Sequence, residues 1–289
     1  MMPLNLLAEW IEQHLNQPLP LSRLATKAGC SIRYLSICFR RACGLSVGAY
    51  IQKRRLTVAS TLLRITRRST TEIALIYQFS HLSSFTRAFK KQFGQPPQAF
   101  RQAWYWDMAL FYPSMAVTDF ICQTDIVSIP DNTWIIPVNN KRKEIHFSLD
   151  FIITTKNGKI ISDQNIHQSM IKTIFRKEVN YPLVVCGNVY PGTECDTDVD
   201  IILGAFTHAN NKNRVSVRSG HYACFVFKGT PPIIMQFHSW AQGHGMHRYR
   251  LVMKRGPTFS VFDKTATEGV YKMEYYIPCL TEDIIPAKP

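Results

Sequence analysis

The sequence predicts a multidomain protein in which an all-α N-terminal domain is followed by an α+β domain. Apolar residues recur at helical spacing through the first hundred of the 289 residues, whereas alternating runs typical of strands begin near residue 120. The charge changes at the same place, because residues 1–106 hold 15 Lys/Arg against 3 Asp/Glu, while the rest of the chain holds 19 against 17. We therefore expect a polyanion-binding unit joined to a domain with another task.

The domain boundaries are expected at residues 1–103 for the helical domain, 104–119 for a connecting segment and 120–289 for the C-terminal domain. The connecting segment lies within AWYWDMALFYPSMAVTDF, which is too aromatic for a free linker. We expect it to pack against one or both domains.

The first hundred residues begin with an amphipathic helix, expected over 4–16. A short helix over 22–28 follows and ends at Gly29, which can adopt the left-handed conformation of a helix C-terminus. Ser31 then caps a helix that runs to about Ala42. This spacing predicts a helix-turn-helix.

The same pattern recurs after a long helix over about 46–64. Ser69 and Glu72 stand in capping-box spacing at the start of a short helix, and Ser80 is expected to cap the helix that follows it. That last helix has two unlike sides: Leu82, Phe85, Phe89 and Phe93 share one, and Ser83, Arg87, Lys90 and Lys91 share the other. One side packs, and the other faces an anion.

The long helix separates the two candidate recognition helices. Its length of about 19 residues corresponds to roughly 28 Å at 1.5 Å per residue. With the width of its end contacts, this is close to the ~34 Å of one DNA turn. Two recognition helices on one chain can thus enter successive major grooves without a dimer.

Two stretches carry a specific resemblance. LATKAGCSIRYLSICFRRACGLSVGAYIQKRRL and IALIYQFSHLSSFTRAFKKQFGQPPQAFR resemble the two halves of the AraC/XylS family of bacterial transcription regulators, the first in the form of its Mar/Sox/Rob branch. The resemblance covers residues 4–101. It implies seven helices, a monomer on an asymmetric site of double-stranded DNA, and RNA polymerase as a further partner. It also implies a cytoplasmic, nucleoid-associated bacterial activator that is not an enzyme.

The resemblance assigns base reading to one set of residues: Arg33, Ser36, Ile37, Ser83, Thr86 and Arg87. The branch usually has Trp, Gln and Arg in the first recognition helix and Gln-Gln then Thr-Arg in the second, so only Thr86 and Arg87 match it. An Arg can pair with guanine, whereas an Ile or Leu can only touch a thymine methyl or pack. Arg33 could instead hold a phosphate, and Leu82 could belong to the core. The resemblance therefore does not imply that this chain binds the usual operator of the family.

Contacts to the DNA backbone are expected from a second set of residues: Arg40, Lys53, Arg54, Arg55, Lys90 and Lys91. The run at 53–55 on the long helix is either a phosphate-facing patch or a solvated face. The shortage of acidic residues in this domain favours the patch.

The C-terminal domain shows strand-like runs over 120–130, 145–155, 182–191, 198–208, 220–229 and 269–278, with helical segments near 163–179 and 232–242. This order predicts an antiparallel sheet with helices on one side.

GHYACFVFKGTPPIIMQFHSW and KMEYYIP resemble the GyrI-like ligand-binding domain. The resemblance places Glu274 where the family keeps a carboxylate that meets hydrophobic cations. Strand alternation puts Lys272, Glu274 and Tyr276 on one face, and Trp240 and Tyr222 could line the same pocket. A small hydrophobic or cationic effector is then expected. Core packing of the aromatic residues and a solvent-side pair of Glu274 with Lys272 remain alternatives.

Two other functions stay open for the chain. One is an architectural DNA binder whose C-terminal domain is only structural. The other is a GyrI-like hydrolase with Glu274 as a base, although no nucleophile accompanies it.

Three classes of site are not expected. Eight cysteines without a C-x-x-C pair indicate free thiols in a reducing compartment. His238, His244 and His247 lack further ligands at zinc-site spacing, and ECDTDVD at 194–200 lacks the Gly and Glu of a calcium loop, so no metal or cofactor is expected. No apolar run approaches the ~20 residues that span a bilayer, and no membrane association is expected.

Overall fold

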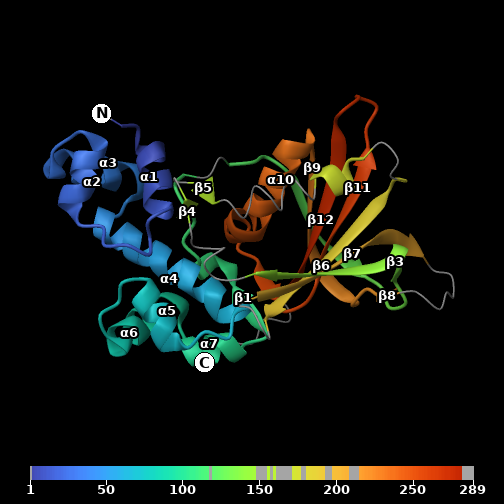
Figure 1. Cartoon of the computed structure of the whole chain (residues 1–289), viewed down its shortest axis with the longest axis horizontal. Coiled ribbons are helices and arrows are strands. Elements are labelled where there is room, and N and C mark those ends of the chain that lie inside the picture. The colour runs from blue at the N-terminus through green and yellow to red at the C-terminus, as the bar shows by residue number, and fades with distance from the viewer. Residues whose placement is uncertain are drawn as a thin grey trace. The chain divides into compact units, whose positions relative to one another are not determined.

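The computed structural model describes residues 2–116, 119–147, 155–156, 159–160, 171–176, 180–192, 197–207 and 215–281. Two compact units contain these residues (Figure 1). The helical unit holds residues 2–103 and 110–116, together with two paired strands of two residues each, β4 (Thr155–Lys156) and β5 (Lys159–Ile160). The β-rich unit holds residues 104–109 and the other described residues from 119 onward.

Seven helices lie in residues 2–103, all of which the structure describes: α1 (Leu4–Glu12), α2 (Leu21–Ala28), α3 (Ile32–Cys43), α4 (Val47–Ile65), α5 (Thr70–Ile76), α6 (Leu82–Phe93) and α7 (Pro97–Gln102). Within this unit, the long α4 runs between α1–α3 and α5–α7 (Figure 1). The helical N-terminal region expected from the sequence is confirmed.

Most of the expected helix caps are present. The Ser31 hydroxyl accepts a hydrogen bond from the backbone N–H of Tyr34 at 3.2 Å, and α2 ends at Gly29 with φ 66°. Ser69 and Glu72 form the full capping box of α5. Local side-chain chemistry thus sets these ends.

Ser80 does not cap α6, contrary to the sequence-based expectation. The N-cap residue is His81, with no side-chain cap. Gln78 takes the left-handed conformation, φ 65°, that Gly29 takes in the first motif. The second motif has one more residue between its left-handed residue and the start of its second helix than the first motif has. The N-cap position of α6 therefore falls on His81 and not on Ser80.

The β-rich unit is built on a ten-stranded antiparallel sheet in which β9 also pairs with β2 and β12. The strands are β1 (Tyr105–Asp107), β2 (Gln123–Ile129), β3 (Trp134–Phe147), β6 (Leu183–Pro191), β7 (Thr197–Thr207), β8 (Val215–Ser216), β9 (Gly220–Gly229), β10 (Val252–Lys254), β11 (Thr258–Lys264) and β12 (Tyr271–Leu280). The path runs β1-β10-β12-β11-β6-β7-β3-β8. The strand-rich C-terminal region is confirmed.

Three short helical elements, η1 (Met108–Leu110), η2 (Ala241–Gly245) and α11 (Met246–Arg248), accompany α10 (Pro231–Trp240), which matches the segment expected near 232–242. Of the segment expected over 163–179, residues 163–170 and 177–179 lie outside the described part, and 171–174 are helical. The expected strand at 145–155 overlaps the end of β3, with 148–154 again outside the described residues. Among the described residues, no helix is both long enough and apolar enough to cross a membrane.

The two faces of β12 differ in what covers them. Met273, Tyr275 and Ile277 are fully buried, and the Tyr275 ring lies 4.2 Å from the ring of His238 on α10. This face is therefore the helix-covered one. Glu274 and the residues that alternate with it lie on the other face.

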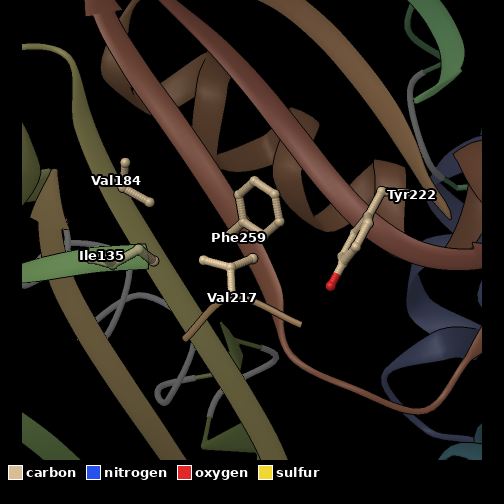
Figure 2. Packing of buried hydrophobic residues seen from close by; sticks show 5 residues of the cluster. All are labelled: Ile135, Val184, Val217, Tyr222 and Phe259. Carbon is tan, nitrogen blue, oxygen red and sulfur yellow. The ribbon is translucent and has the colours of Figure 1, made fainter. Parts of the chain in front are cut away.

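The second face carries its own apolar cluster, formed by Ile135, Val184, Val217, Tyr222 and Phe259 (Figure 2). The rings of Tyr222 and Phe259 lie 5.3 Å apart. The sheet thus has packed side chains on both sides.

Candidate nucleic-acid interface

The helices α3 and α6 are counterparts. Each has twelve residues, and every residue of α3 corresponds to the residue 50 positions later in α6. The correspondence holds for the packed side, where Leu35 and Phe39 match Phe85 and Phe89, all of them buried. Two copies of one helix-turn-helix motif, α2–α3 and α5–α6, are thus built around α4.

A glycine ends each of these helices. Gly44 has φ 71° and Gly94 has φ 75°, both in the left-handed region where a side chain is disfavoured. An added Cβ would meet no atom within 4 Å at either position, so the backbone angle alone requires glycine. The two helices therefore end at corresponding positions and in the same backbone conformation.

The outward side of α3 is cationic with one apolar residue in it. Arg33 and Arg40 are exposed, and Ile37 between them is 42% exposed. Ser36 is half-buried, and its hydroxyl donates to the carbonyl of Ile32 at 2.8 Å. The three expected base readers of the first motif therefore share one side of one helix.

The outward side of α6 carries the readers expected in the second motif. Ser83 and Arg87 are exposed, and Thr86 is half-buried. Lys90 and Lys91 continue this side toward the helix C-terminus, where both are exposed. Cations near this end also suit the helix dipole.

Leu82 is not part of the core. It is 43% exposed, while Phe85, Phe89 and Phe93 are buried as expected. Leu82 is the first residue of α6, so its side chain extends beyond the layer of rings that the later turns bury.

Arg54 differs most from its expected role as a phosphate contact. It is 9% exposed, and its Nε and Nη2 donate to the two carboxylate oxygens of Glu12 at 2.8 and 2.7 Å. Its Nη1 donates to the carbonyl of Tyr112. A guanidinium held inside the helical unit is not available to DNA, so we correct this assignment.

Lys53 and Arg55, which flank Arg54 in the sequence, are only partly buried. The Lys53 ammonium lies 5.5 Å from the centre of the Tyr112 ring. Arg55 is half-buried and donates to the carbonyls of Leu15 and Gln17 at 2.9 and 2.6 Å, and burial lowers its pKa. Three consecutive cations thus point in three directions, as successive residues of a helix must.

In the β-rich unit, Glu274 lies between two donors. The Lys272 ammonium and the Tyr276 hydroxyl each donate to one carboxylate oxygen at 2.5 Å. Burial alone would raise the pKa of Glu274, but these hydrogen bonds and the charge of Lys272 outweigh it, so the pKa lies below its usual value. The carboxylate is ionised at neutral pH and is already paired.

The aromatic residues expected around Glu274 are divided between the two faces. The Tyr276 ring stacks on Phe259 at 4.4 Å, and Tyr222 packs on the same Phe259. Trp240 instead lies on α10, and its ring contacts Phe225 and Phe237 on the helix-covered side. The structure brings Tyr222 and Tyr276 to the Glu274 face and places Trp240 on the opposite one.

The described residues include no cluster of side chains suited to a metal ion. No group of three His, Cys, Asp or Glu side chains there is arranged to hold an ion. Residues 193–196 lie outside the described part, so the stretch at 194–200 is described only from 197. Seven cysteines that the structure describes are free thiols.

The sequence matches known regulators over this unit. The family model described as "Helix-turn-helix domain" matches residues 24–103. Regulatory protein SoxS of Salmonella typhimurium is 37% identical over 95 residues, which are 33% of this chain and 89% of SoxS. The chain belongs to the AraC/XylS family.

Two longer relatives refine the placement of this AraC/XylS regulator. Transcriptional regulator Rob of Salmonella typhimurium is 28% identical over 257 residues, which are 86% of this chain and 85% of that protein. The right origin-binding protein of Escherichia coli K12 is 42% identical over 111 residues, which are 38% of each chain. Similarity to SoxS and Rob supports the Mar/Sox/Rob branch, and the chain is a helix-turn-helix, DNA-binding transcription regulator.

Proposed function

We propose that this AraC/XylS regulator is an activator that binds an asymmetric duplex site as a monomer, with α3 and α6 in successive major grooves. The observation that carries the proposal is the equivalence of the two helices, each with buried apolar residues on one side and cations on the other. The 19 residues of α4 span about 28 Å, close to one turn of DNA. RNA polymerase is the proposed second partner, on the nucleoid of a bacterial cell.

The proposed roles follow from position on the helices. Residues near the N-terminal half of a recognition helix reach base edges, and residues at its C-terminal end meet the phosphates. The proposed base readers are Arg33, Ser36, Ile37, Ser83, Thr86 and Arg87. The proposed phosphate contacts are Arg40, Lys53, Lys90 and Lys91, with Arg55 contributing only through the part of its guanidinium not bound to carbonyls.

Replacing Arg87 by alanine should weaken binding to the preferred duplex by about 1–3 kcal/mol and relax sequence preference at one position, since a bidentate guanine contact is lost. Lys91→Ala should weaken all duplexes alike and reduce the slope of log affinity against log salt by about 1. With about six phosphate contacts, the full chain should show a slope near −5. Binding of selected and scrambled duplexes would be titrated at several salt concentrations.

Arg87 and Lys91 are a matched pair, because both are exposed cations on the same helix. If Arg87→Ala lowered the affinity for selected and scrambled duplexes equally, Arg87 would be a phosphate contact. A salt-independent affinity of the full chain would contradict the proposed interface as a whole.

We also propose that the β-rich unit is a GyrI-like effector-binding domain whose site is the Glu274 face. An ionised, half-buried carboxylate beside Tyr276, with Phe259 and Tyr222 in the same layer, supports a ligand that is both hydrophobic and cationic. Lys272 holds one carboxylate oxygen, so an incoming cation competes with it.

This competition gives two opposite expectations. Glu274→Gln should weaken a lipophilic cation by tenfold or more, since charge-assisted contacts contribute about 1.5–3 kcal/mol. Lys272→Gln should strengthen the same cation, because it frees the carboxylate and removes a like charge. Binding of a quaternary ammonium dye and of a neutral dye of equal shape would be followed by fluorescence.

The neutral dye is the control, and its affinity should barely change in either variant. If no dye bound saturably to the wild-type chain, the β-rich unit would be structural, as in an architectural DNA binder. Turnover of an electrophilic ester that Glu274→Gln abolished would instead favour a GyrI-like hydrolase.

A further inference from the structure

The outward sides of the two recognition helices differ at their centre. Ile37 falls midway between buried Leu35 and Phe39, so it projects from the side of α3 opposite the core. Its counterpart in α6, 50 positions later, is Arg87, midway between buried Phe85 and Phe89. The first helix thus has a branched aliphatic group where the second has a guanidinium.

The surroundings of Ile37 suit a polyanion. Arg33 lies one turn before it and Arg40 about one turn after it, and both are exposed. At 42% exposure, the side chain of Ile37 leaves much of its aliphatic surface outside the packing of the helical unit. An occupant of this side must therefore offer negative charge at the flanks and a small apolar group at the centre.

Duplex DNA has one such group in the major groove. The C5 methyl of thymine is the apolar feature of the base edges there, and phosphates border the groove on both sides. Guanine offers two acceptors instead, which a guanidinium can meet and an isoleucine cannot.

We propose that Ile37 is a specificity-determining residue that selects thymine through its methyl group, while Arg87 selects guanine at the corresponding place of the other half-site. This inference rests on the proposed function and adds the chemistry by which the two halves of the site are told apart. The regulator then recognises two unlike half-sites with one motif used twice.

Deoxyuridine tests the proposal directly, because it lacks the C5 methyl and keeps every hydrogen-bonding group of thymidine. The highest-affinity duplex would be selected from a random library with the full chain. Each thymidine would then be replaced singly by deoxyuridine. We expect at least one position at which the wild-type chain loses about fourfold in affinity, the effect of one buried methyl-sized group.

The variants assign that sensitivity to a side chain. Ile37→Ala should bind the selected duplex more weakly and no longer distinguish thymidine from deoxyuridine at the sensitive position. Leu75→Ala is the matched control, because Leu75 is 58% exposed but lies on α5 and not on a recognition helix. It should keep the wild-type ratio. Ile37→Arg should change the preferred base at that position to guanine.

Two results would overturn the inference while leaving sequence-specific binding intact. One is equal wild-type affinity for thymidine and deoxyuridine at every position. The other is an unchanged thymidine-to-deoxyuridine ratio in Ile37→Ala. If no duplex were enriched from the library at all, the proposed function would fail and this inference with it.

Discussion

Arg54→Met is expected to lower the free energy of unfolding of the helical unit by about 3–5 kcal/mol, because removing one partner of a buried ion pair leaves the other charge without compensation. The side chains of Arg54 and Glu12 are only 11% and 20% exposed. Glu12 also accepts from the Tyr50 hydroxyl at 3.0 Å, and burial, followed by the charge of Glu12, raises the pKa of Tyr50 to about 12. Urea unfolding of the full chain, followed by circular dichroism at 222 nm, would measure the change.

Two further variants test whether the loss of stability comes from the ion pair itself. The double variant Arg54→Met with Glu12→Leu should recover much of the lost stability, because an apolar pair of similar volume replaces both charges. Arg41→Met removes an exposed cation of α3 and should change stability by less than about 0.5 kcal/mol. A double variant as unstable as Arg54→Met alone would show that the ion pair is not the cause.

A fragment ending at residue 103 is expected to be less stable than one ending at 118 by about 3–5 kcal/mol, the usual cost of deleting a buried phenylalanine. Phe111 is 6% exposed, and its ring lies 5.4 Å from Phe93 and 6.2 Å from Phe100. The backbone N–H of Tyr112 also donates to the Thr57 hydroxyl at 3.0 Å. The helical unit therefore includes residues beyond its last helix.

Urea unfolding of both fragments would test this. The shorter fragment lacks β1, and the longer one contains β1 without its partner β10, so the pairing of β1 contributes to the stability of neither fragment. Phe111→Ala in the longer fragment should reproduce most of the difference. Equal stability of the two fragments would mean that residues 110–116 pack without contributing.

Features that depend on neighbouring residues could be predicted from the sequence. The Ser31 cap, the Ser69–Glu72 capping box and the buried phenylalanines of α6 each depend on residues within one or two helical turns. The same holds for the alternation of β12, where successive side chains must point to opposite faces.

Features that depend on residues far apart in the sequence could not be predicted from it. Arg54 is turned inward by Glu12, 42 positions earlier, although its spacing from buried Tyr50 and Ile51 already placed it on the packed side of α4. The short strand β1 forms only because β10 lies beside it, and the aromatic connecting segment gave no sign of it.

The face of the sheet on which Trp240 lies could not be predicted from the sequence for a different reason. Alternation along β12 divides its residues into two sets, but it does not say which set a helix covers. The placement of α10 over Tyr275 decides this, and it puts Trp240 on the side away from Glu274.

The continuous helix α4 has a consequence for how the chain can evolve. Inserting one residue among its 19 would turn the second motif by about 100° and move it by about 1.5 Å, so the outward sides of α3 and α6 would no longer keep their present relative orientation. Inserting seven residues would nearly restore the angle but add about 10.5 Å, the length of roughly three base pairs. In the proposed binding mode, substitutions on the outward sides of α3 and α6 would change which bases are contacted, whereas the length of α4 would set the distance between the two contacted sites. If the proposed binding mode holds, α4 should therefore tolerate changes of sequence far better than changes of length, because its length fixes the spacing of the two half-sites.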